Sequence, residues 1–152
     1  MRKVVLAAAI VAAMSIQGAS AADRNCYSAA DVEAEQAFLF QTNLMVVSSA
    51  CHDSVYGEFR ARVKDAIIRY QNAMIDHFRR TGSKNPKGDF DAWQTGLANQ
   101  LSLKQSAVPT VQVCQQAAEM LKLASTLDSK GFRDYAVAHA VSAADPHPKC
   151  GR

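Results

Sequence analysis

The chain has 152 residues, 49% of them hydrophobic and 20% charged, which suits one domain with a sizeable core and leaves little room for a second. The formal net charge is +3, and two of the 17 basic residues, Arg2 and Lys3, stand next to the initiating methionine. Without these two, 15 basic residues face 14 acidic ones, a balance of +1 that argues against a nucleic-acid-binding protein, which carries a domain-wide basic excess.

The N-terminus predicts a cleaved export signal over residues 1–21. A short positive start precedes an apolar run over residues 4–16, and Ala19 and Ala21 supply the small side chains that a signal peptidase requires. The apolar run, about 13 residues long, is shorter than the roughly 20 residues that cross a bilayer. We therefore expect a mature domain over residues 22–152, in the periplasm or secreted, with no transmembrane segment.

Helical periodicity dominates the mature sequence. Ser28, with Asp31 three residues later, predicts a capped helix start, and apolar residues then recur at steps of three and four over residues 29–50. A second pattern predicts one continuous helix over residues 54–80. Gly82 follows its basic last turn, as is typical of a helix C-terminus.

Three further helices are predicted. Asp89 is expected to cap the third, Pro109 to open the fourth, and a short fifth to span residues 132–143. The tail over residues 145–150 carries two prolines and is expected to be irregular. Short connections between long amphipathic helices favour an all-α, antiparallel up-down bundle of four main helices plus the short fifth.

Four cysteines follow the leader, and an even number in an oxidising compartment predicts two disulfides. In an up-down bundle the end of the first helix and the start of the fourth lie at the same end, which favours pairing Cys51 with Cys114 and Cys26 with Cys150. Two alternatives remain open: Cys26 with Cys51 plus Cys114 with Cys150, and Cys26 with Cys114 plus Cys51 with Cys150.

Two histidines are the most informative titratable residues. His77 and His139 both fall on predicted inward faces and are expected toward the same half of the bundle. Two buried histidines could bind a metal ion or shuttle protons. However, the helical spacings of metal-binding motifs are absent, so the preferred interpretation places each histidine at the core boundary, and no cofactor is predicted.

The second predicted helix carries a basic face made of Arg60, Arg62, Lys64 and Arg69. Such a face could attract an anionic envelope component, although an ordinary solvated surface is the preferred interpretation. There is no glycine-rich phosphate loop and no pair of inward carboxylates, so no catalytic residues and no enzymatic activity are predicted.

Three stretches, EAEQAFLFQTNLMVVSSAC, YGEFRARVKDAIIRYQNAMIDHFRR and TGLANQLSLKQS, resemble an uncharacterised family of small exported bacterial all-helical proteins of unknown function. The resemblance implies export and a helical fold and carries over no catalytic residues. The leading hypothesis is a non-enzymatic periplasmic binding or interaction module whose partner is an unknown protein or envelope component, in an unknown oligomeric state. The alternative is a metal- or cofactor-binding bundle using His77 and His139, and an enzyme ranks last.

Overall fold

The computed structural model describes residues 26–142 and 147–150, and within them the chain forms six helices. They are α1 (Ala29–Cys51), α2 (Val55–Arg62), α3 (Lys64–Arg80), α4 (Pro86–Ser106), α5 (Thr110–Thr126) and α6 (Ser129–Ser142). The predicted leader over residues 1–21, with Asp145 and Pro146 of the tail, lies outside the described residues. The predicted all-α class is confirmed.

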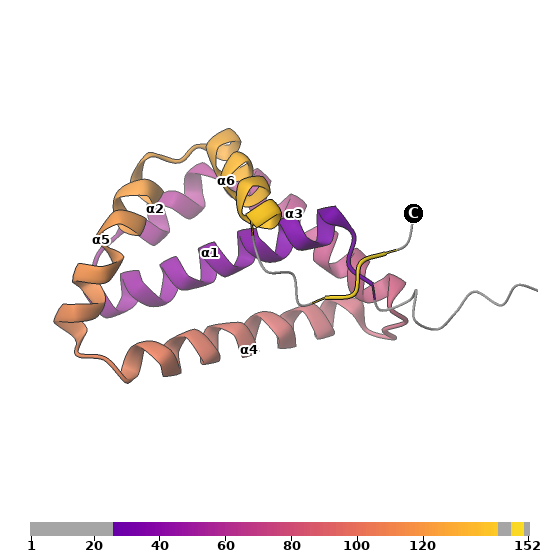
Figure 1. Ribbon diagram of the computed structural model, residues 1–152, viewed down its shortest axis with the longest axis horizontal. Coiled ribbons are helices and arrows are strands. Elements are labelled where there is room, and N and C mark those ends of the chain that lie inside the picture. Colours follow the sequence, from indigo (N-terminus) through magenta and orange to yellow (C-terminus); the bar gives the residue numbers. More distant parts are fainter. Residues whose placement is uncertain (1–25, 143–146, 151–152) are drawn as a thin grey trace, which may run out of the picture.

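Helix α1 is the central element, and it packs against every other helix of the described chain (Figure 1). It starts as predicted, because Ser28 Oγ accepts from the Asp31 N–H while the Asp31 carboxylate accepts from the Ser28 N–H. Only Ala29, Ala30 and Ser49 of this helix are exposed. A helix without a solvent face must be covered by its neighbours on all sides.

The prediction of one continuous helix over residues 54–80 is wrong in one respect. The chain divides at Val63 into α2 and α3. Val63 is fully buried and has φ −106° and ψ 17°, outside the helical range. Its N–H still donates to Phe59 O, and its carbonyl still accepts from the Ile67 N–H. Because the chain divides here, α2 packs against α5 and α3 packs against α4. One straight helix could not contact both.

Helix α4 begins three residues before the expected cap. Asn85, not Asp89, is the N-cap, and its side-chain oxygen accepts from the Gly88 N–H at 3.3 Å. Pro86 then occupies the first turn, where its missing N–H costs nothing. Asp89 lies within that turn instead, and its carboxylate accepts from the Ser83 hydroxyl.

The main core is aromatic. Phe40, Phe59 and Phe132, from α1, α2 and α6, meet edge to face or tilted with ring centroids 5.1–6.0 Å apart. Phe38 makes edge contacts with Phe90 of α4. A much smaller apolar cluster of Val47, Val113 and Ala117 joins α1 to α5. The α5 end of α1 therefore has a thin core.

Two disulfides join distant parts of the chain, Cys51 with Cys114 and Cys26 with Cys150. This is the pairing that the sequence favours over its two alternatives. The first ties the end of α1 to α5, beside the thin core. The second ties the start of α1 to the tail, where Tyr27 and Lys149 also form an isolated parallel bridge.

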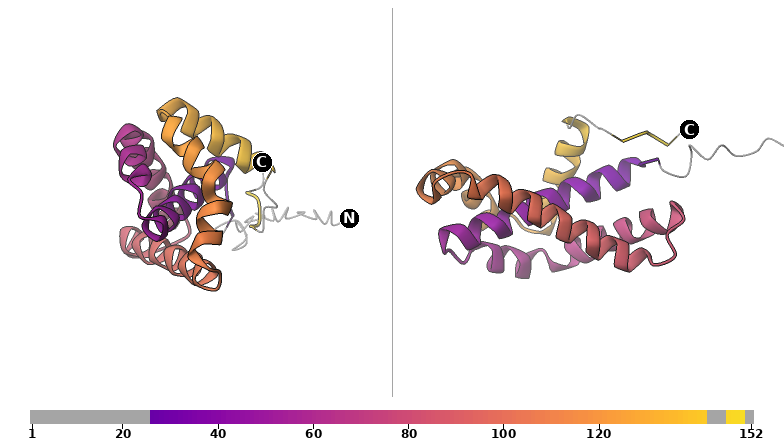
Figure 2. Two further views of the ribbon diagram at one scale, coloured as in Figure 1. Left: turned by 90° about the vertical axis from the view of Figure 1, so that its left-hand side faces the viewer. Right: turned by 90° about the horizontal axis from the view of Figure 1, so that it is seen from below.

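The antiparallel up-down arrangement of four main helices is not confirmed. Helices α3 and α4 run alongside α1, whereas α5 and α6 cross it steeply (Figures 1 and 2). The two crossing helices nevertheless make the most extensive contacts of α1 with any neighbour. Within the described residues no helix combines the length and the apolarity needed to cross a membrane.

Replacing both Cys51 and Cys114 by alanine is expected to lower the free energy of unfolding by about 4 kcal/mol. The bond closes a loop between residues 63 apart, which restricts the unfolded chain. Urea unfolding of the oxidised double variant and of the wild type, followed by circular dichroism, measures the difference. A loss below about 1 kcal/mol would show that packing alone holds α5 to α1.

Candidate functional site

His77 lies in a buried polar cluster at the start of α1. Asp31 and His77 are only 2% and 4% exposed, and His77 Nδ1 lies 3.4 Å from Asp31 Oδ2. Both Asp31 carboxylate oxygens also accept from Arg80 Nη2, at 2.7 and 2.8 Å. The cluster joins the first turn of α1 to the last turn of α3, so its residues hold two helix ends together.

Opposing effects set the charges of this cluster. Burial raises the pKa of Asp31, but hydrogen bonds from Arg80 and Ser28 outweigh it and leave that pKa below its usual value. Burial lowers the pKa of His77, and the attraction of Asp31 only partly offsets this effect. The favoured state is an Asp31–Arg80 ion pair beside a neutral His77.

The chain termini close over this cluster. The Tyr27 ring lies between two imidazoles, with its centroid 4.1 Å from that of His77 and 3.8 Å from that of His147, which it stacks upon. His147 Nε2 lies 3.0 and 3.1 Å from the two carboxylate oxygens of Glu35. We call Tyr27, His147, Glu35 and the Cys26–Cys150 bond the terminal clasp. These contacts pair most of the polar groups here, although His77 Nδ1 is buried and lies only within 3.4 Å of Asp31 Oδ2, without a hydrogen bond of normal geometry.

The expectation that His139 faces inward with His77 is wrong. His139 is exposed on α6 and stacks on Tyr135, with ring centroids 4.0 Å apart, whereas His77 is buried with Asp31. The ring of Tyr135 turns to the core side of α6 and the imidazole remains in solvent. Among the described residues no three His, Cys, Asp or Glu side chains are grouped so that they could hold a metal ion.

The predicted basic face divides into two kinds of residue. Arg60, Lys64 and Arg69 are exposed. Arg62 is exposed as well, but it also reaches across to α5, where its guanidinium donates to Ala124 O at 2.7 Å and to Leu127 O at 3.3 Å. A cation bonded to the last carbonyls of a helix stabilises that end, so Arg62 has a structural role.

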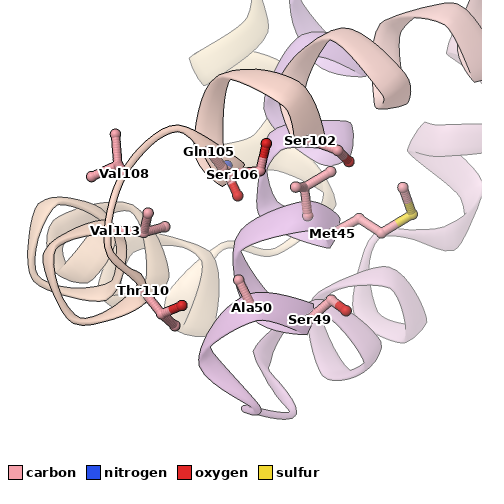
Figure 3. A pocket seen from close by; sticks show the side chains of 10 residues that line it. Met45, Ser49, Ala50, Ser102, Gln105, Ser106, Val108, Thr110 and Val113 are labelled. Carbon is pink, nitrogen blue, oxygen red and sulfur yellow. The ribbon is translucent and has the colours of Figure 1, made fainter.

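A cleft with a different character lies at the other end of α1, where it meets α4 and α5 (Figure 3). Its volume is about 520 Å³, within the range of ligand-binding pockets. We name it the α4–α5 cleft, and it is lined by Met45, Val46, Ser49, Ala50, Ser102, Gln105, Ser106, Val108, Thr110 and Val113. None of these side chains is ionisable. Apolar and hydroxyl or amide groups share its walls.

Gln105 is the polar centre of this region. It lines both the α4–α5 cleft and a neighbouring hollow of about 340 Å³. Its Nε2 donates to Asn43 Oδ1 at 3.0 Å, and Asn43 Nδ2 lies 3.5 Å from Met120 Sδ. Its Oε1 is buried and has no hydrogen-bond partner within the described residues. A buried acceptor of this kind is costly unless a donor reaches it.

The sequence analysis missed the α4–α5 cleft and the contacts of Arg80 and Glu35. Serine, valine and glutamine on three helices form no motif, and their meeting depends on how α5 crosses α1. The Asp31–Arg80 pair joins residues 49 apart in sequence, for which a charge pattern along one helix gives no signal.

Comparison of the chain with protein-family models, with curated proteins and with solved structures gives no match. The resemblance to small exported helical proteins therefore stays a prediction. The site is described from its own geometry.

We expect the free energy of unfolding to fall as the pH drops below 6.5, the ordinary pKa of histidine. The folded state depresses the His77 pKa, so the unfolded chain takes up the proton first and gains stability. The Asp31 contribution is lost separately, below its ordinary value of 3.8.

The His77→Gln variant should lose the fall in unfolding free energy that begins below pH 6.5 and keep the fall that begins below pH 3.8. Urea unfolding from about pH 7.5 to about pH 3 measures both falls. His139→Gln, which removes an exposed histidine, is the control and should retain the wild-type profile. If the unfolding free energy of His77→Gln still falls below pH 6.5 as in the wild type, another group causes that fall.

Arg62→Gln is expected to lower the free energy of unfolding by about 1 kcal/mol, because it removes charge-assisted bonds to two helix-end carbonyls. Arg60→Gln removes the same charge from an exposed position and should change stability by less than about 0.5 kcal/mol. Thermal and urea unfolding of the pair measure the contrast. Equal effects would mean that overall charge, not the α5 contact, is responsible.

Proposed function

We propose that the protein is an exported, non-enzymatic binding module that docks a protein of the cell envelope or its surroundings at the α4–α5 cleft. The observation that carries this proposal is the cleft itself, which has pocket-like volume and uncharged, mixed apolar and polar walls. Its surroundings are also apolar. Leu103 and Val111, each next in the chain to a lining residue, are 71% and 70% exposed.

Export supports this function and is itself part of the proposal. The leader predicted over residues 1–21 and the two disulfides fit a protein of the periplasm or the extracellular space. The resemblance to small exported bacterial helical proteins would agree with that location. We include it as a proposal of kinship, with no activity attached.

The distribution of charge favours docking at this cleft over a site at the histidines. Asp31, Arg80, Glu35 and His147 bind one another in and above the buried cluster. They hold helix ends and the terminal clasp in place. The cleft side chains make fewer such contacts: Gln105 bonds to Asn43, Ser106 donates to Leu103 O, and Val113 packs in the small α1–α5 cluster.

A photo-cross-linking benzoylphenylalanine at Val111 is expected to give a defined adduct with the partner in cells of the source organism. The same residue at Asn72, exposed on α3, should give none. Ser102→Trp, which fills the cleft, should abolish the Val111 adduct. Gel analysis with mass spectrometry identifies the products.

Gln100→Trp is the matched control, because position 100 is exposed on the side of α4 turned away from Ser102. It adds the same side chain to the same helix and should leave the adduct intact. Adducts of equal yield at Val111 and Asn72, or a Val111 adduct that survives Ser102→Trp, would remove the cleft from the proposal.

A further inference from the structure

The α4–α5 cleft has the form of a short trough between two helices. Met45 and Ser49 lie one turn apart on α1, and Ser102 and Ser106 lie one turn apart on α4 (Figure 3). One turn spans about 6 Å along a helix. The turn between α4 and α5, with Val108, closes one end. A trough of this length accommodates about two residues of extended chain, which rise roughly 3.3 Å each.

The lining favours an uncharged occupant. Its polar groups are three serines, one threonine and one glutamine, and the remaining five side chains are apolar. A charge placed there would meet no opposite charge in the lining. Neutral amide groups suit the hydroxyls, and small apolar side chains suit Met45, Val46 and Val113.

Gln105 indicates the hydrogen-bonding character of the occupant. Its Nε2 is already bound to Asn43, so the amide offers an acceptor, the buried Oε1, in need of a donor. The last torsion of a glutamine side chain is soft, so the amide can turn its oxygen toward the trough, and the Nε2–Asn43 bond is then exchanged for the bond to the occupant. A polypeptide presents one backbone N–H per residue, whereas apolar lipids present none.

We propose that the α4–α5 cleft binds two consecutive uncharged residues of a partner polypeptide in extended conformation. A backbone N–H of the segment donates to Gln105 Oε1, and its apolar side chains contact Met45, Val46 and Val113. This inference rests on the proposed docking function and names the partner's chemistry. Recognition combines one backbone bond with apolar contacts, as in other peptide-binding grooves.

The test is an NMR titration of the ¹⁵N-labelled chain, with both disulfides formed, by the blocked dipeptide N-acetyl-Val-Leu-amide. Saturable shifts are expected at the amides of Gln105, Ser106 and Thr110. N-acetyl-Asp-Leu-amide should bind at least tenfold more weakly, because it carries a charge. The analogue methylated at the Leu nitrogen, which removes a backbone N–H, should bind at least fivefold more weakly.

Gln105→Leu keeps the size of the side chain and removes the acceptor, so it should weaken dipeptide binding at least fivefold. Gln100→Leu, on the far side of α4, should bind as the wild type does. If Gln105→Leu fails to fold, the two altered peptides on the wild-type chain decide the matter alone. Equal binding of all three peptides, or shifts confined to other helices, would overturn the proposal.

Two other occupants give recognisable results. Concentration-dependent shifts at the same amides without any peptide would mean that a second copy fills the cleft, and would overturn the proposal. Stronger binding of 1-octanol than of the dipeptide would point to a neutral small molecule and would also overturn it. A Val111 adduct that persists while the dipeptide fails to bind would leave the docking function standing and reject only the peptide segment.

Discussion

The burial of α1 on every side is the constraint on which the rest of the structure depends. A helix whose apolar and small residues point in all directions is stable only when other elements cover its whole circumference. Two neighbours run alongside it and two cross it, and the division at Val63 is part of this covering. The disulfides act at the two ends of this helix, at Cys51 and just before Ala29, where fewer apolar side chains are available.

The two ends of α1 are held by different physical means. At the start, Asp31, Arg80 and His77 combine charge and hydrogen bonding beneath the terminal clasp. At the end, Cys51 and Cys114 form a covalent bond beside a cluster of only three buried apolar residues. The aromatic core lies between them. Hollows lie at both ends of α1: one of about 340 Å³, lined in part by Val32 and Val141, borders the polar start, and the α4–α5 cleft borders the disulfide-linked end.

Much of the local structure could be predicted because it depends on neighbours in the sequence. The Ser28–Asp31 cap is an example. The cysteine pairing is favoured on different grounds, from which helix ends are expected to lie together, because its partners are 63 and 124 residues apart. The failures share a different cause. No proline or glycine at position 63 indicates that the helix divides there. The dihedral angles of Val63 allow α2 and α3 to contact different helices, which the local sequence does not reveal. His139 is exposed although it stacks on Tyr135 one turn earlier on α6, because only the earlier turns of that side pack against the core.

The candidate site was beyond prediction for the same reason. Ser49, Ser102 and Gln105 are ordinary residues on separate helices, and only the crossing of α5 brings their surroundings together. The Cys51–Cys114 bond ties α1 to α5 beside the cleft, and none of the lining side chains is ionisable. Because Ala50 and Val113 of the lining are next in the chain to Cys51 and Cys114, the shape of the cleft depends on the oxidised state of this cysteine pair and not on the charge of its lining.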